Sequence, residues 1–96
     1  MRRHAIAIKN EDNVATAICD IAAGEQAMVG VDDAIISIKA TQAIDLGHKL
    51  AVRAIRKGDE ILKYGTGIGR ATQDIQAGEH VHVHNVESMR GRGDLA

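Results

Sequence analysis

The sequence predicts a small all-β domain in which short strands are joined by tight glycine turns. Three observations support this prediction: glycine recurs after short apolar segments, the segments between glycines often alternate apolar and polar side chains, and proline is absent from the 96 residues. We expect no long helix. A chain of this length makes one domain, near the lower limit at which a hydrophobic core can stabilise a fold without disulfides or metals.

The composition limits both the core and the kinds of partner. With no Phe or Trp, the core must come from Ala, Ile, Val and Leu, and we expect Tyr64 to pack in it. Cys19 is the single cysteine, so neither an intrachain disulfide nor a cysteine zinc cluster can form. A formal net charge of −1 provides no basic face for nucleic acid. The first residues form neither a signal peptide nor a membrane span, so we expect a cytoplasmic protein without membrane association.

One short pattern of an isoleucine followed by a glycine occurs four times. Three of the four copies continue with an acid, at Glu25, Asp59 and Glu79. We interpret each copy as a corner, in which a buried isoleucine closes one strand and a left-handed glycine turns the chain into the next strand. Their uneven spacing argues against a solenoid. The copies are Ile21-Ala22-Ala23-Gly24, Ile44-Asp45-Leu46-Gly47, Ile55-Arg56-Lys57-Gly58 and Ile75-Gln76-Ala77-Gly78.

The segments between the corners are short, and most of them predict strands or turns. Residues 31–34 predict a turn between two strands, and residues 60–64 alternate as a strand does. Residues 50–55 fit a strand or a helix by pattern, but the flanking glycines leave room only for a short element. We expect the folded domain to cover residues 1–86 and residues 87–96 to form a polar tail, either mobile or binding a partner.

The run His80-Val81-His82-Val83-His84-Asn85 is the most informative chemical feature of the chain. In a strand, alternate side chains share one face and lie about 6 to 7 Å apart, so His82 and His84 can converge on one metal ion. His80 and His84 would lie roughly 13 Å apart, so all three cannot share an ion unless the strand bends. Three half-exposed histidines without a function remain the alternative.

Two further segments offer substrate contacts. A glycine-rich loop follows Lys63 and precedes Arg70, but its Gly-x-Gly-x-Gly spacing and the absence of room for a following helix exclude a dinucleotide-binding loop. The loop lets a ligand or another chain approach, with Lys63 and Arg70 as partners for a carboxylate. His48 and Lys49 begin a strand directly after a turn, where side chains can be presented at a rim, although a solvated polar pair explains them equally well.

Four motifs in order along the chain resemble the small SAF domain of the altronate and galactarate dehydratase family. The resemblance implies a β-clip fold and a hydro-lyase that removes water from a sugar acid to give a 2-keto-3-deoxy acid. It also implies ferrous iron and a separate large catalytic subunit as partner, while assembly with copies of itself stays open. The motifs are Asp12-Asn13-Val14-Ala15, Gly47-His48-Lys49, Lys63-Tyr64-Gly65-x-x-Ile68-Gly69-x-Ala71 and Gly78-Glu79-His80-Val81-His82-Val83-His84-Asn85.

Under this resemblance we expect His82 and His84 to face a cavity of the partner as metal ligands or proton donors, with Asn85 orienting one of them. The expected contacts to the substrate are His48, Lys49, Lys63 and Arg70. Three other functions remain open: a small subunit of (2R)-sulfolactate sulfo-lyase, which eliminates sulfite; a non-catalytic module for carbohydrate binding or assembly; and a free metal-binding protein that keeps its metal when isolated.

Overall fold

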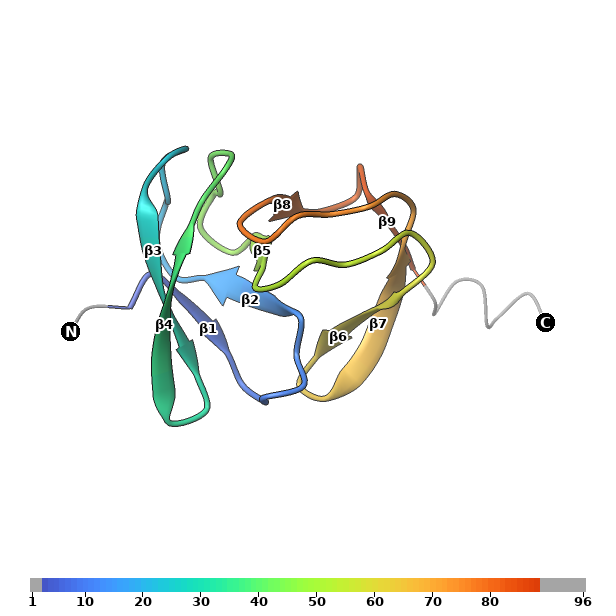
Figure 1. The fold of residues 1–96 in the computed structure, drawn as a ribbon, viewed down its shortest axis with the longest axis horizontal. Helices are drawn as coiled ribbons and strands as arrows, with labels where there is room; N and C mark the ends of the chain where they lie inside the picture. The colour runs from blue at the N-terminus through green and yellow to red at the C-terminus, as the bar shows by residue number, and fades with distance from the viewer. Residues whose placement is uncertain (1–2, 89–96) are drawn as a thin grey trace.

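The computed structural model describes residues 3–88, and within them the chain is all-β and contains no helix, which confirms the predicted fold class. No membrane-spanning helix is therefore found among these residues. The strands are β1 (Ala5–Ala7), β2 (Val14–Ala17), β3 (Gln26–Val31), β4 (Ala34–Lys39), β5 (Lys49–Ala51), β6 (Glu60–Lys63), β7 (Thr66–Ala71), β8 (His80–Val81) and β9 (Val86–Ser88). Figure 1 shows β3 and β4 at one end of the molecule, and β6, β7 and β9 at the other.

The strands form one sheet of six and one sheet of three. The large sheet has the order β4-β3-β1-β2-β5-β8, and the small sheet has the order β6-β7-β9. Neighbouring strands run antiparallel except for β1 and β3, which are parallel. The strand β8 is therefore at an edge of the large sheet and lies beside β5, in the half of the molecule nearer the small sheet (Figure 1).

The four glycine corners form as predicted. Each glycine has a positive φ, between 86° and 93°, which a residue with a Cβ atom adopts only with strain. The isoleucines of the four corners are buried and pair with one another in two antiparallel bridges, Ile21 with Ile44 and Ile55 with Ile75. We name each corner after its glycine: Gly24, Gly47, Gly58 and Gly78.

The paired corners also share a reciprocal set of backbone hydrogen bonds. In each corner the glycine N–H donates to the carbonyl of a buried alanine, which stands four residues before the isoleucine of the partner corner. One backbone pattern is thus used four times, and it joins the Gly24 corner to the Gly47 corner and the Gly58 corner to the Gly78 corner. The bonds are Gly24 to Ala40 (2.7 Å), Gly47 to Ala17 (2.9 Å), Gly58 to Ala71 (2.8 Å) and Gly78 to Ala51 (2.8 Å).

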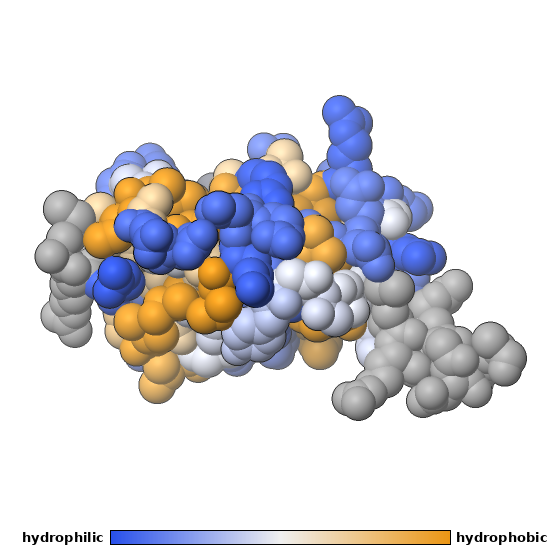
Figure 2. Space-filling model, turned by 90° about the horizontal axis from the view of Figure 1, so that it is seen from below, coloured by the Kyte–Doolittle hydropathy of each residue, from blue (hydrophilic) through white to orange (hydrophobic). Residues whose placement is uncertain are grey.

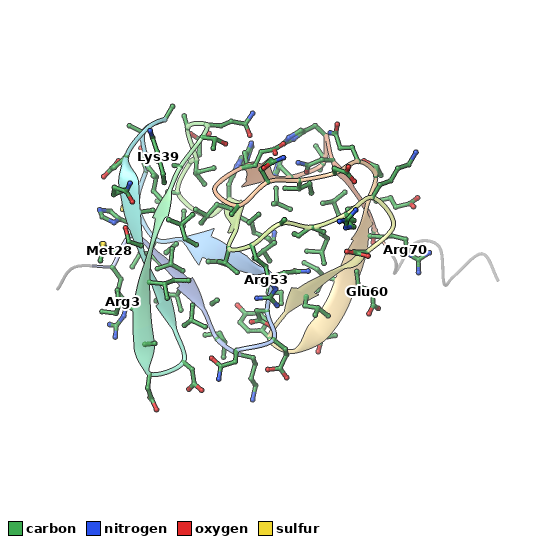
Figure 3. All side chains as sticks on the ribbon, viewed as in Figure 1. Arg3, Met28, Lys39, Arg53, Glu60 and Arg70 are labelled. Atoms are coloured by element: carbon green, nitrogen blue, oxygen red, sulfur yellow. The ribbon has the colours of Figure 1, made fainter. Side chains whose placement is uncertain are left out.

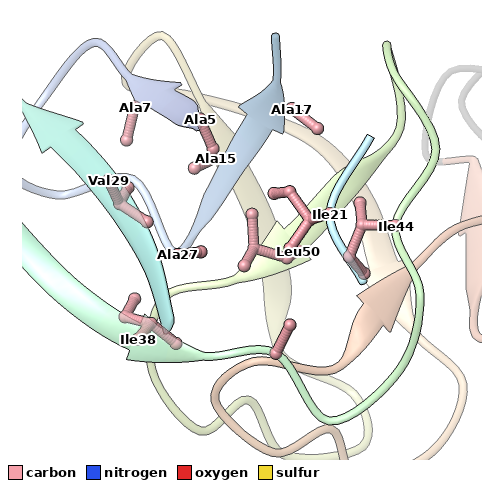
Figure 4. Packing of buried hydrophobic residues seen from close by; sticks show 11 residues of the cluster. Ala5, Ala7, Ala15, Ala17, Ile21, Ala27, Val29, Ile38, Ile44 and Leu50 are labelled. Carbon is pink, nitrogen blue, oxygen red and sulfur yellow. The ribbon is translucent and has the colours of Figure 1, made fainter. Parts of the chain in front are cut away.

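Small side chains dominate the core under the large sheet. Alanine supplies more than half of the cluster in Figure 4, and Ile21, Ile38, Ile44 and Leu50 supply its largest side chains. A second cluster lies under the small sheet and β8 and includes Ile61 and Val81. The prediction that Tyr64 packs in the core is wrong: this residue is 57% exposed, on the turn between β6 and β7, with a φ of 58°. Its ring instead lies under the Lys63 amine, which is 5.0 Å from the ring centroid.

A buried carboxylate and amide join the loop after β1 to the β6–β7 hairpin. Asp12 accepts hydrogen bonds from the N–H groups of Lys9 (3.1 Å), Tyr64 (2.9 Å) and Gly65 (2.7 Å). Burial by itself would raise the pKa of Asp12, but the backbone N–H groups outweigh it and hold this pKa below its usual value. Asn13 accepts from the N–H of Leu62 (2.7 Å) in the same hairpin. The two sheets are therefore tied together by fully satisfied polar groups.

The face of the molecule seen in Figure 2 divides by polarity along its length. In Figure 2, apolar side chains gather on the half formed by the large sheet, and hydrophilic side chains cross the middle and cover much of the small-sheet end. Ile8, Ile18 and Ile35 are among the exposed large apolar residues of the large-sheet half. Strand β9 extends to Ser88, and residues 89–96, which make up most of the predicted tail, lie outside the described residues.

Candidate histidine site

The strand that carries the histidine run is shorter than predicted. β8 ends at Val81, the chain bends at His82, and residues 83–85 form a turn, so the expected strand through His84 is wrong. Asn85 explains the difference. Its buried side-chain amide accepts a hydrogen bond from the His82 N–H (2.9 Å) and donates one to the His80 carbonyl (2.9 Å), which closes the turn. Val83, in this turn, is 83% exposed.

The bend brings the histidine rings together. The ring centroids of His80 and His84 are 5.2 Å apart, far less than the roughly 13 Å of a straight strand. A fourth ring, that of His48, joins them: its Nδ1 lies 2.9 Å from Nε2 of His80, and it stacks on His82 with centroids 4.1 Å apart. One nitrogen from each of His48, His80 and His82 lies within 4.8 Å of the others. We call these three residues the histidine cluster.

Strand pairing explains why His48 reaches the run. β5 and β8 are antiparallel, with Leu50 opposite His80 and Lys49 opposite Val81. One step further along the same register places His48 opposite His82, and side chains opposite each other in an antiparallel pair are close enough to interact. The stacked rings of His48 and His82, which are only 8° from parallel, are the result.

His48 also departs from the rule of the other corners. In the Gly24, Gly58 and Gly78 corners, the acid after the glycine accepts a hydrogen bond from the backbone N–H three residues before it. The Gly47 corner has His48 at this position, and its ring bonds to His80 instead. This exception within the repeat is the sequence signal that marks His48. The capping bonds are Ala22 to Glu25 (2.9 Å), Arg56 to Asp59 (3.1 Å) and Gln76 to Glu79 (2.8 Å).

Side-chain amides hold the backbone around the cluster from both sides. Gln42, on the segment that leads into the Gly47 corner, accepts a hydrogen bond from the His80 N–H (2.9 Å). Asn85 holds the His80 carbonyl and the His82 N–H, as described above. Asn85 therefore positions the backbone of these two histidines, whereas the sequence suggested that it orients a ring. Sequence reasoning did not identify Gln42, because its contact is to a residue far along the chain.

The electrostatic environment favours neutral imidazoles. Burial lowers the pKa of His80, and so do His84, His48 and His82, while the charge of Asp45 acts in the opposite direction. The pKa of His82 is also lowered, first by burial and then by His48, Lys49 and His84. A neutral imidazole offers a nitrogen lone pair to a metal ion or a proton. The lowered pKa values of His80 and His82 therefore favour the form in which these two rings offer a nitrogen lone pair.

Of the residues predicted to bind substrate, Lys49 lies beside the histidine cluster, whereas Arg70 lies in the small sheet. Lys49 and His82 both line a hollow of about 270 Å³ whose other walls are mainly apolar. Burial lowers the pKa of Lys49, and the nearby positive charge of Lys63 lowers this pKa further. Arg70 lies on β7 in the small sheet (Figure 3), and its Nε is buried without a hydrogen-bond partner among the described residues. The other walls of the hollow are Ile61, Ile68, Val81, Val83, Val86 and Ser88.

The fold and the site define a small all-β domain that presents nitrogen donors beside a shallow, largely apolar hollow. Comparison with known proteins agrees with the resemblance: residues 3–89 match the family model of the altronate/galactarate dehydratase SAF domain, and the chain belongs to this family. It is 43% identical over 83 residues to an altronate dehydratase of Bacillus subtilis and 44% identical over 77 residues to that of Escherichia coli. These matches cover 86% and 80% of this chain but only 16% and 15% of the two relatives.

A second group of relatives is shorter. The chain is 36% identical over 63 residues to the (2R)-sulfolactate sulfo-lyase subunit alpha of Paracoccus pantotrophus. This match covers 66% of this chain and 94% of the relative. The relatives are thus named as lyases of two kinds, in one of which the matching region is nearly a whole subunit.

Proposed function

We propose that this chain is the SAF component of a sugar-acid dehydratase, which eliminates water from an aldonic acid to give a 2-keto-3-deoxy acid together with a large catalytic subunit. The observation that carries this proposal is the 43% identity to an altronate dehydratase over 86% of the chain. Because the chain spans only 16% of that relative, most of the active site would belong to the large subunit.

The histidine site suits the chemistry of such a dehydration. The reaction removes a weakly acidic proton beside a carboxylate and expels hydroxide from the next carbon, so it needs groups that accept and donate protons near neutral pH. His82 faces the hollow, and His80 is linked to His48 by the 2.9 Å contact between ring nitrogens. Where these two nitrogens do not hold a metal ion, a proton taken up at one ring can be passed to its neighbour. Lys49, on the wall of the hollow, would attract the substrate carboxylate.

The shape of the hollow supports the need for a partner. A sugar acid carries many hydroxyl groups, and each requires a polar contact when it is removed from water. The hollow offers few, since its walls are mainly Ile and Val side chains and only Lys49, His82 and Ser88 are polar. A large subunit that covers this surface would supply the remaining polar contacts and exclude water. The apolar walls and the exposed Val83 would then pack against it.

Ferrous iron is the metal that the family resemblance implies, and the residues present fit it. Imidazole nitrogens are accepted ligands of iron(II), and His48, His80 and His82 gather three of them. An iron ion held there would stabilise negative charge on the substrate oxygens. His84, which the sequence pairs with His82, lies beside His80 and outside this group of three.

A second candidate function is that of the alpha subunit of a sulfolactate sulfo-lyase, which eliminates sulfite. It is favoured by one observation: the match to the Paracoccus protein covers 94% of that subunit, so a chain of similar size is sufficient there. Both candidates place the chain in a two-component lyase, and they differ in the leaving group.

The test is to produce the chain with its large subunit and to incubate the pair with altronate and with sulfolactate. We expect 2-keto-3-deoxy acid from altronate and no product from either subunit alone. Release of sulfite from sulfolactate would support the second candidate instead. If the large subunit turns over equally well without this chain, the chain is a binding or assembly module and the proposal is wrong.

A further inference from the structure

The histidines of this chain are concentrated at one place. Four of the five lie together at the edge of the large sheet, on the Gly47 corner, in β8 and on the turn that follows it. His4, the fifth, has a structural role, since its Nδ1 accepts a hydrogen bond from the Met28 N–H (2.8 Å) and its Nε2 lies 3.4 Å from a Glu25 carboxylate oxygen. The backbone beside the other four histidines is held by different side chains: the amides of Gln42 and Asn85 bond to the adjacent strand and turn.

The Gly47 corner gives up a capping bond to place His48 in the cluster. In three of the four corners, an acid at this position accepts a hydrogen bond from a backbone N–H. An acid is therefore the residue that stabilises the corner best at this position. The His48 ring makes no such capping bond; its Nδ1 instead lies 2.9 Å from Nε2 of His80, and it stacks on the ring of His82. A ligand that requires nitrogen donors accounts for this exchange.

From these observations we infer that His48, His80 and His82 form a binding site for a divalent transition-metal ion within this chain. The Nδ1 of His48 and the Nε2 of His80, 2.9 Å apart, can both lie about 2.1 Å from one ion, the usual length of a metal–imidazole bond. The third nitrogen, from His82, lies within 4.8 Å of these two. A site of three imidazoles selects ions such as Fe²⁺, Co²⁺, Ni²⁺ or Zn²⁺ over Mg²⁺ and Ca²⁺.

Binding requires one local movement. An imidazole coordinates through the lone pair in the plane of its ring, so the His48 and His82 rings, stacked 8° from parallel, must separate. His82 is placed to move, because it lies on the bend beyond the last ladder pair of β8. The ring of His84 is exposed and tilted by 38° against that of His80, and it is not one of the three ligands.

The inference concerns the chain by itself and does not depend on the reaction proposed above. The experiment is to titrate the untagged, metal-free full-length chain with Co²⁺ and with Zn²⁺, and to follow cobalt absorption and heat of binding. We expect one ion per chain. His48→Gln should weaken binding by at least about tenfold while keeping the corner folded, since glutamine can accept the backbone N–H as the acids of the other corners do.

His84→Ala is the matched control, because it removes a histidine of the same group that is not a ligand in this site. We expect it to change affinity by less than about threefold, whereas His82→Ala should match His48→Gln; thermal unfolding verifies that each variant is folded. No saturable binding by the unaltered chain, or an equal loss with His84→Ala and His48→Gln, would overturn the inference. Failure of the turnover assay alone would affect only the proposed function.

Discussion

The Gly24 and Gly47 corners are bonded to each other through the same backbone pattern, yet they differ in the residue that follows the glycine. Glu25 turns back and caps its own corner, whereas His48 reaches across to the edge strand and meets His80 and His82. The backbone bonds of the two corners are equivalent. The comparison shows that the fold depends on the glycine, the isoleucine and the alanine, and that the position after the glycine is available for chemistry.

The largest effect is expected where the glycine itself is essential. At Gly78 a Cβ atom would collide with the carbonyl oxygen of Lys39, and the φ of 88° adds strain. At Gly58 the space is open and only the strain remains. Urea unfolding should therefore show a loss of about 3 kcal/mol or more for Gly78→Ala and about 1 kcal/mol for Gly58→Ala. Equal losses would mean that the corners do not differ in packing.

The next effect concerns the chemistry of the histidine that stacks on the Gly47 corner's His48. In the complex with the large subunit, His82→Ala should lower kcat about 100-fold, because a positioned proton-transfer group or metal ligand is lost. The unfolding free energy should change little, since the His82 side chain lies at the surface beside the hollow. Ile35→Ala, on the distant strand β4, is the control and should leave kcat unchanged. Unchanged kcat with His82→Ala would remove this residue from the mechanism.

The histidines that contact the Gly47 corner should also make the stability of the fold depend on pH. The pKa values of His80 and His82 are depressed in the folded protein, so the unfolded chain binds protons more readily than the folded chain as pH falls below about 6.5. The stability contributed by neutral histidines is complete above this pH and is lost as pH falls through the depressed pKa values. Asp12 acts only below its usual pKa of 3.8.

Urea unfolding between pH 8 and pH 5 measures this pH dependence. We expect the unfolding free energy to decrease with falling pH, and the double variant His80→Gln/His82→Gln to show a flatter profile than the unaltered chain. His84→Ala should also flatten the profile, though less, because its charge contributes to both shifts. An identical slope in the double variant would contradict the depressed pKa values.

The smallest effect is expected when the Gly47 corner receives an acid after its glycine, as the other three corners have. His48→Glu should let the Gly47 corner cap its own backbone as Glu25 does in the partner corner, and it should raise the unfolding free energy by about 0.5 kcal/mol. The reverse change, Glu25→His, should lower it by a similar amount. Thermal unfolding of both variants tests the pair. A loss of stability in His48→Glu would show that the imidazole contacts matter to the fold more than the cap.

Much of the fold follows from local rules that can be read along the chain. A glycine after a short apolar segment adopts a positive φ in all four corners, because the turn requires it wherever the segment occurs. The expectation for Tyr64 was wrong, because scarcity of aromatic residues says nothing of where one of them points. Its backbone lies in a left-handed turn, and the buried carboxylate of Asp12, in the loop after β1, holds that turn.

The sequence by itself determined the all-β class, the four corners and the presence of a histidine run, because each depends on neighbouring residues and on the two-residue period of a strand. Only the tertiary structure decided which histidines meet. The bend at His82 depends on the buried amide of Asn85, and the entry of His48 depends on the register between β5 and β8. Contacts of this kind join residues far apart in the chain, and no local pattern specifies the geometry between them.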